Sequence, residues 1–223
     1  EKPSAGVNGS GKHNNWSLTT DGGKNLIDPG KTPRENTRFL FFLAAIVRAV
    51  DEYQDLLRLS VAYPGNDHRL GGYEAPPAIV SIFLGAELTA ILDSIIAGRD
   101  YVDISKKKLQ IGVDTMPELP QDTTDRNRTS PLAFTGNKFE FRMLGSSQPV
   151  SEPNVVLNTA VAAALDEFAT VLEAAEDFHA ALDNLIRDVI RTHKRIIFNG
   201  NGYDEAWIRE AESRGLSNYP TTA

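Results

Sequence analysis

The stretch KFEFRM, residues 138–143, alternates charged and apolar side chains. Successive side chains of a β-strand point to opposite faces of its sheet. Lys138, Glu140 and Arg142 should therefore share one face, and Phe139, Phe141 and Met143 the other. The pattern predicts a half-buried strand with a charged face.

A second stretch, HNNWSL at residues 13–18, alternates in the same way, with His13, Asn15 and Ser17 on one face. If the two strands are neighbours, His13 and Glu140 could share a hard divalent cation, because Mn²⁺ and Mg²⁺ accept imidazole nitrogen and carboxylate oxygen. Lys138 and Arg142 would flank that cation and neutralise phosphate oxygens. The alternative is the solvent face of a sheet, where such charges pair for little energy. Spacing alone favours the alternative.

Apolar residues at helical spacing predict four helical regions. The first begins at Thr32, an N-cap followed by proline at the first helical position, and runs to about Ser60. The others are residues 85–97, ending at Gly98, residues 154–194, which could hold two helices, and residues 204–214. Residues 78–84 form an apolar run that could be a strand. The fold class is therefore α+β: an antiparallel β-sheet with a polar, ligand-facing side, backed by long α-helices.

The composition of the 223 residues, 41% hydrophobic and 24% charged, is that of an ordinary globular protein. A net charge of −7 argues against general binding to nucleic acid or to an anionic membrane. The absence of cysteine excludes disulfides and thiolate metal sites and fits a reducing, cytoplasmic location. No apolar run reaches the ~20 residues that cross a bilayer, so no membrane span is expected. Because the chain lacks an initiator methionine, we expect it to be a piece of a longer protein.

The segment NDHRLGGYEAPP, residues 66–77, combines charges with paired glycines and paired prolines. The glycines let the backbone turn or approach a ligand, and the prolines stiffen the far end. This composition is poorly suited to a helix. It predicts a loop that presents Arg69 and Glu74 as a binding or catalytic flap.

Two further segments are candidates for anion binding. Residues 8–11, NGSG, could turn backbone amides toward a small polar ligand, although a plain turn is the simpler interpretation. Residues 125–128, DRNR, offer two guanidinium groups that suit phosphate or carboxylate, and a surface cluster of salt bridges is the alternative.

Together, these segments resemble glutamine synthetase, most closely its large type III branch. The blocks that carry the resemblance occur in the family's order: NGSGKHNNWS (8–17), NDHRLGGYEAP (66–76), NRTSP (127–131) and NKFEFR (137–142). The resemblance implies that residues 1–223 are the C-terminal portion of the catalytic domain. The N-terminal β-grasp domain and the upstream metal ligands would then be absent, so we expect this chain alone to be inactive.

The resemblance also implies a reaction. Members of this family ligate ammonia to L-glutamate with ATP, forming L-glutamine through γ-glutamyl phosphate, with Mg²⁺ or Mn²⁺ as cofactor. They are ring-shaped homo-oligomers, which implies a dodecamer of two hexameric rings.

The roles that the resemblance implies can be assigned position by position. His13 and Glu140 match metal ligands. Asn8, Gly9 and Arg69 match the part that binds the amino-acid substrate. Ser17 and Lys138 match nucleotide-side positions. Glu74, Arg128 and Arg142 match catalytic residues: Glu74 closes the site and takes a proton from ammonium, and the two arginines stabilise the transferred phosphoryl group.

The chain departs from compact relatives in two ways. Asn15 stands where many of them have a second histidine, and the stretch between Ala78 and Arg128 is an insertion. A γ-glutamyl-amine (polyamine) ligase would share nearly all these motifs. A non-catalytic homologue with a sensing or assembly role would not need them intact. Independently of the resemblance, a sugar- or phosphate-binding β module without turnover is a third interpretation.

Overall fold

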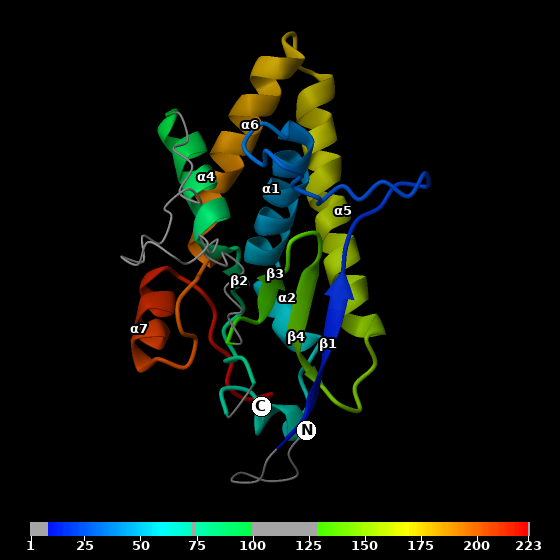
Figure 1. The fold of residues 1–223 in the computed structure, drawn as a ribbon. Helices are drawn as coiled ribbons and strands as arrows, with labels where there is room; N and C mark the ends of the chain where they lie inside the picture. Colours follow the sequence, from blue (N-terminus) through cyan, green and yellow to red (C-terminus); the bar gives the residue numbers. More distant parts are fainter. Residues whose placement is uncertain (1–8, 73–74, 100–128, 223) are drawn as a thin grey trace, which may run out of the picture.

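The computed structural model describes residues 9–72, 75–99 and 129–222, and it has the predicted α+β architecture, with a small sheet packed on helices (Figure 1). The strands are β1 (Gly11–Trp16), β2 (Ile82–Phe83), β3 (Leu132–Phe134) and β4 (Phe139–Gly145). The helices are α1 (Thr37–Glu52), α2 (Gln54–Leu59), α3 (Pro64–Asp67), α4 (Gly85–Ala97), α5 (Ser151–Glu173), α6 (Phe178–His193) and α7 (Glu205–Ser213), with a short 3-10 helix, η2 (Lys194–Ile196).

The sheet has the strand order β1-β4-β3-β2. The β1–β4 and β3–β4 pairs are antiparallel, whereas β2 and β3 are parallel. The prediction of a purely antiparallel sheet is therefore wrong at its β2 edge. The reason is the connection: the chain leaves β2 through α4 and returns to β3 in the same direction, and parallel neighbours require such a crossover. The strand expected over residues 78–84 is confined to Ile82–Phe83.

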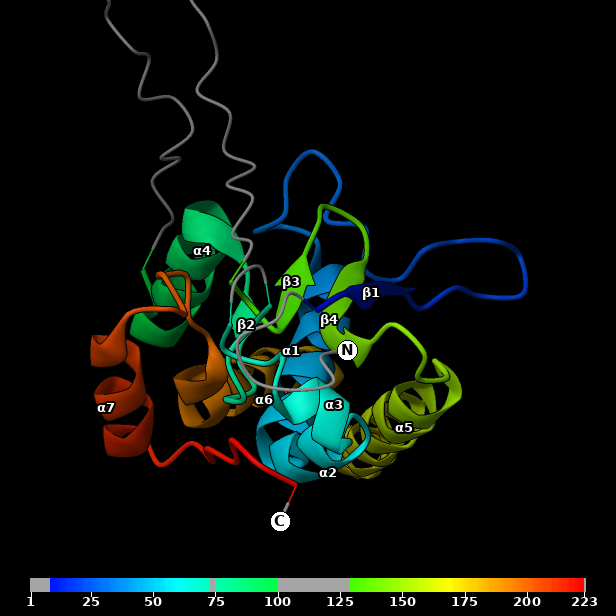
Figure 2. The same ribbon diagram turned by 90° about the horizontal axis from the view of Figure 1, so that it is seen from below.

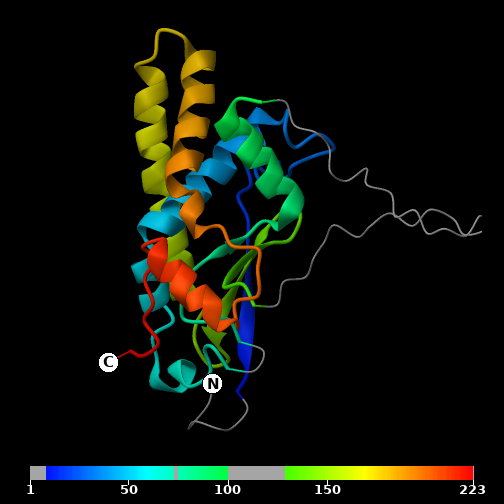
Figure 3. The same ribbon diagram turned by 90° about the vertical axis from the view of Figure 1, so that its left-hand side faces the viewer.

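One face of the sheet forms the core against α1. Phe139, Phe141 and Met143 are fully buried, as the alternation predicts. The rings of Phe39 and Phe134 lie 5.9 Å apart and those of Phe134 and Phe139 5.2 Å apart, so aromatic contacts join helix and sheet. Seen from below and from the side, α1 lies between the sheet and the α5–α6 pair (Figures 2 and 3). The opposite face of β1 and β4 is left for polar residues.

The start of α1 corrects the helix predicted from Thr32. The backbone amide of Asn36 bonds to the carbonyl of Thr32, and residues 32–36 form turns. Asn36 is the N-cap: its Oδ1 accepts from the amide of Phe39 at 3.1 Å, and its Nδ2 donates to the carbonyl of Asp28. The Asn36 side chain binds both the first turn of the helix and the segment before it, so the helix begins after Asn36 and not at the predicted N-cap, Thr32.

The helix predicted from Thr32 to Ser60 is also divided in two at Tyr53, whose dihedrals (φ −112, ψ 24) depart from the helix. The other three helical regions were predicted correctly. The helix at residues 85–97 is confirmed, and Gly98 ends it at φ 61. Residues 154–194 do hold two helices, α5 and α6, which together project beyond the sheet (Figure 3). The last predicted helix is confirmed as α7, with Asp204 as its N-cap.

Helix α5 is, by length and composition only, long and apolar enough to cross a membrane. Its buried face, which includes Leu157 and Phe168, packs against the core. Two polar bonds fasten it to β1: Asn14 Nδ2 donates to Asn154 Oδ1 at 2.7 Å, and Trp16 Nε1 donates to Asn158 Oδ1 at 2.8 Å. Helix α5 thus supports the strand that carries His13.

A buried ion pair joins α2 to α3, and the C-terminal residues bind to both of its members. Arg58 Nη2 lies 2.6 Å from Asp67 Oδ1, and its Nε donates to the carbonyl of Tyr219 at 2.8 Å. The hydroxyl and amide of Thr222 donate to the other oxygen of Asp67. Burial by itself raises the pKa of Asp67, but the hydrogen bonds from Thr222 and Arg58 lower this pKa overall.

Because the folded-state pKa of Asp67 lies below its ordinary value, its stabilisation is complete above that value and disappears as the pH falls through the folded-state pKa. We expect Asp67→Asn to lower the free energy of unfolding at pH 7 by about 3 kcal/mol, since it leaves Arg58 without its counter-charge. The difference from wild type should shrink below about pH 4. Urea denaturation at pH 7 and at the lowest pH where wild type stays folded tests this, with exposed Asp21→Asn as control. An equal difference at both pH values would contradict it.

Candidate functional site

Strands β1 and β4 are neighbours, and they bring His13 and Glu140 together on the polar face of the sheet. His13 Nδ1 lies 2.8 Å from Glu140 Oε1. The His13 side chain is 51% exposed and that of Glu140 19%, so the pair is open to a ligand on the side away from α1. The structure thus brings together the two residues predicted to share a cation.

Arg142 holds the second oxygen of the same carboxylate. Its Nε and Nη2 lie 2.9 Å and 2.8 Å from Glu140 Oε2. Burial raises the pKa of Glu140, but the hydrogen bond and charge of Arg142, followed by those of His13, lower this pKa below its ordinary value overall. Glu140 is therefore ionised at neutral pH and acts as an acceptor. The three side chains form one row from an imidazole through a carboxylate to a guanidinium.

The pairing of β1 with β4 is interrupted by a bulge at this row. Lys12 pairs with Leu144 and Asn14 with Phe141, so two residues of β4, Arg142 and Met143, stand opposite the single residue His13. A bulge re-aims the side chains around it and increases the local twist. Arg142 is the residue of 138–143 that departs from the predicted alternation: it is buried, as are Phe141 and Met143 on either side of it.

Arg69 donates hydrogen bonds to the backbone carbonyls of both bulged residues. Its Nη2 donates to the carbonyl of Arg142 at 3.1 Å, and its Nη1 donates to the carbonyl of Met143 at 3.2 Å and to Asn66 Oδ1 at 3.1 Å. Arg69 is only 4% exposed, and burial lowers its pKa. A Cβ on Gly11 would lie 2.0 Å from Arg69 Nη2, so β1 passes directly over the guanidinium.

These contacts correct two expectations for residues 66–77. Arg69 does not lie on an exposed flap: its guanidinium is buried and donates two hydrogen bonds to backbone carbonyls of β4. The segment also enters through a helix, α3, which Pro64 can start because its missing N–H is not needed at a first position. Asn66, for which the sequence predicted no role, is fully buried and donates to the carbonyls of Val61 and Met143. The sequence feature that could have indicated this role is the position of Asn66 in the same motif as Arg69.

The chain is similar to known proteins along its whole length. The family model for the glutamine synthetase C-terminal domain matches residues 181–223. The chain is 55% identical, over 100% of its length, to a protein named Type-3 glutamine synthetase from Dictyostelium discoideum. It is 48% identical, over 98% of its length, to proteins named glutamine synthetase from Bacteroides fragilis and from Butyrivibrio fibrisolvens. This chain belongs to the glutamine synthetase family. It spans about a third of these curated relatives, 31% of each.

Some of the remaining positions that the glutamine synthetase resemblance singled out are described by the structure. Lys138 and Ser17 are exposed, just before β4 and just after β1, and Gly9 is partly buried. Asn8, Glu74 and Arg128 lie outside the described residues, as does most of the insertion predicted between Ala78 and Arg128.

The donors present fit part of the divalent-metal site expected for a glutamine synthetase. Adjacent ligands of an octahedral cation with bonds of about 2.1 Å are about 3 Å apart. Glu140 Oε1 and His13 Nδ1 are 2.8 Å apart, and the carboxylate is ionised. In residues 9–72, 75–99 and 129–222 there is no group of three or more His, Cys, Asp or Glu residues that could hold a metal ion. The pair therefore supplies two ligands, and further donors must come from elsewhere.

Proposed function

We propose that the protein containing this chain ligates ammonia to L-glutamate with ATP, giving L-glutamine through γ-glutamyl phosphate. The observation that carries the proposal is the 48–55% identity along this chain to three proteins named glutamine synthetase. The row of His13, Glu140 and Arg142 supports it, because the residues with matching motifs meet at one place in the fold. The proposed partners are L-glutamate, ammonia, ATP and further copies of the protein in a ring.

Phosphoryl transfer needs positioning and charge neutralisation more than covalent help. In the proposed site, His13 and Glu140 would hold Mg²⁺ or Mn²⁺. The bound cation would neutralise charge on the phosphate oxygens. Arg142 is already oriented by Glu140, so its guanidinium would meet the transferred phosphoryl group with little loss of side-chain freedom. Lys138 and Ser17 would contact the nucleotide from the exposed edge of the same face.

The proposed role of Arg69 combines structure with substrate binding. Three hydrogen bonds occupy Nη1 and Nη2, and none of them uses Nε–H. Of the two N–H groups that these three bonds leave, Nε–H would bind the carboxylate of L-glutamate, with Gly9 beside it at the entry to β1. A guanidinium held by the backbone presents that donor in a fixed direction, which favours selective binding of one carboxylate.

The experiment that tests the function is product analysis. The full-length protein, with Mg²⁺ or Mn²⁺, ATP and L-glutamate, is given ammonium or a polyamine as the acceptor. We expect glutamine with ammonium and no γ-glutamyl-amine with the polyamine. Formation of only the γ-glutamyl-amine would replace the proposal by its closest alternative, and no ATP consumption with either acceptor would favour a non-catalytic homologue.

Glu74, in the proposed role of the base that takes a proton from ammonium, allows a sharper test. We expect Glu74→Ala to retain formation of the acyl phosphate, seen as slow release of phosphate from ATP that depends on glutamate. Glutamine formation should fall by about 100-fold or more, the range of a general base. Both products are measured in the same reaction, with exposed Glu176→Ala as control. Unchanged glutamine synthesis would refute the role.

A further inference from the structure

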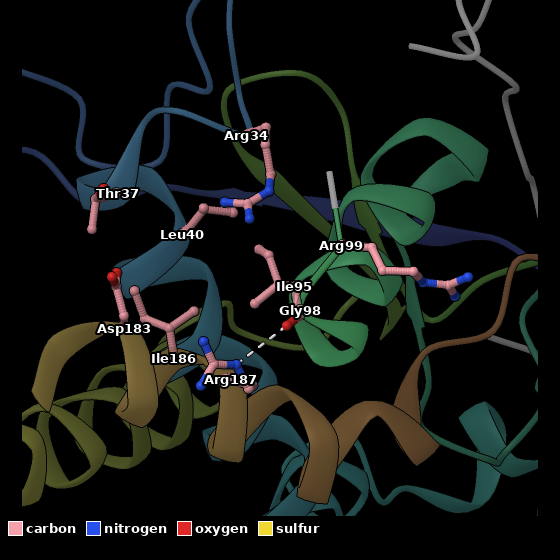
Figure 4. Close-up of a pocket in the computed structure, with 9 residues that line it drawn as sticks. All are labelled: Arg34, Thr37, Leu40, Ile95, Gly98, Arg99, Asp183, Ile186 and Arg187. Carbon is pink, nitrogen blue, oxygen red and sulfur yellow. Dashed lines mark hydrogen bonds between the residues drawn. The ribbon is translucent and has the colours of Figure 1, made fainter. Parts of the chain in front are cut away.

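A pocket of about 220 Å³ lies between α1, α4 and α6 (Figure 4). Its lining residues come from the approach to and start of α1, the end of α4 and the middle of α6, and none comes from the sheet. They are Arg34, Thr37, Leu40, Ile95, Gly98, Arg99, Asp183, Ile186 and Arg187. The pocket is therefore separate from the row on β1 and β4.

The charge of this pocket is opposite to that of the protein. Three guanidinium groups and one carboxylate line it, although the whole chain has a net charge of −7. Several arginines elsewhere in the described residues pair with carboxylates, among them Arg48 with Glu52 and Arg191 with Asp188. By contrast, the structure records no ion pair for Arg34, Arg99 or Arg187 with any described residue.

Two of these arginines are placed to act together. Figure 4 shows Arg34 and Arg187 entering the same space from opposite sides, with Arg99 at the rim and turned away. Arg187 is held in place: its Nε donates to the carbonyl of Ile95 at 3.3 Å and its Nη1 to Asn184 Oδ1 at 2.8 Å. Its Nη2 takes part in neither bond. A fixed guanidinium with a spare edge loses little entropy when it binds an anion.

The floor between the two arginines is apolar. Leu40, Ile95 and Ile186 are buried residues that line the pocket. Desolvated walls strengthen the attraction between a guanidinium and an oxyanion. The volume is below the ~300–1,000 Å³ of pockets for drug-sized ligands, so the occupant must be small.

We propose that this pocket binds a small organic anion. Its carboxylate or phosphate would lie between Arg34 and Arg187, and a short carbon chain would rest on Leu40, Ile95 and Ile186. Binding there would join α1 to the end of α4 and to α6; the bond from Arg187 to the carbonyl of Ile95 connects α6 with α4 but does not reach α1. The site is independent of the proposed ligation reaction, since it shares no residue with it.

The test is calorimetric titration of the protein at constant ionic strength with butyrate and, separately, with butyl phosphate. We expect saturable binding of at least one probe. Arg34→Gln should weaken it about tenfold or more, since a charge-assisted bond is lost. Arg38→Gln is the matched control, because Arg38 is exposed in the first turn of α1, four residues from Arg34, and does not line the pocket. Its affinity should equal that of wild type.

Each outcome has a meaning. Binding of butyl phosphate alone identifies a phosphorylated ligand, and binding of butyrate alone a carboxylate. Saturation by neither probe, or equal affinity in Arg34→Gln and wild type, overturns the proposal. Arg187→Gln should also weaken binding, but it removes two structural bonds. Arg34 makes no recorded bond to a described residue, so its variant should stay folded and decides the question by itself.

Discussion

Replacing Glu140 by glutamine is expected to abolish divalent-metal binding beside β1 and β4, with glutamine formation lost in consequence. The carboxamide keeps the shape of the side chain but removes the negative charge that a hard cation needs. Glu140 is ionised because Arg142 and His13 hold its pKa below the ordinary value, so the effect is present at neutral pH. We expect Mn²⁺ affinity to fall by at least about 100-fold, more than the loss of a residue that only orients a ligand.

Glu140→Gln also removes the carboxylate that Arg142 binds, so a second variant must separate ligand loss from ion-pair loss. His13→Ala does this, because it leaves both contacts between Arg142 and Glu140 Oε2 in place. Titration with Mn²⁺, followed by electron paramagnetic resonance, measures the free ion, and exposed His179→Ala is the control. If His13→Ala binds Mn²⁺ as tightly as His179→Ala, the imidazole is no ligand and the metal assignment fails.

Local features of the sequence predict much of this fold. The alternation at residues 13–18 and 138–141 gave the correct faces, because one side of each strand is buried and the period of two leaves no ambiguity. Gly98 and Asp204 gave correct helix ends for a similar reason: each acts through its own backbone or side chain, with φ 61 at Gly98 and a bond from Ala206 N to Asp204 Oδ1. At these helix ends and strand faces, the residues near in sequence were sufficient to predict the structure.

Predictions failed where a distant segment decides the outcome. The parallel pairing of β2 with β3 depends on a crossover through α4, which no local pattern specifies. The meeting of His13 with Glu140 required the two strands to be neighbours, and spacing alone favoured the opposite interpretation. Only the order of four motifs reversed it. The bulge opposite His13 was also invisible, since the contacts of Arg69 and Asn66 with β4 span more than 70 residues of sequence.

That bulge leads to the second large prediction. Arg69→Ala should lower the free energy of unfolding by about 3 kcal/mol or more, because it leaves two backbone carbonyls and Asn66 Oδ1 without their donor in a buried place. Metal binding should weaken as well, since the bulge sets the direction of Arg142 and the position of His13. Urea denaturation and Mn²⁺ titration measure the two effects, with exposed Arg209→Ala as control.

Two further variants distinguish this structural role from substrate binding alone. Arg69→Lys keeps the charge, but one ammonium cannot reproduce a planar fork that reaches three acceptors, so most of the stability should still be lost. Gly11→Ala leaves the Arg69 side chain unchanged but places a methyl carbon 2.0 Å from Arg69 Nη2, so the guanidinium would have to move. It should therefore destabilise the protein through the same contact. If Arg69 only bound substrate, all three variants would unfold like wild type and only the KM for glutamate would rise. Loss of stability in Gly11→Ala and in both Arg69 variants would instead locate the bulge as the element that positions the proposed metal site.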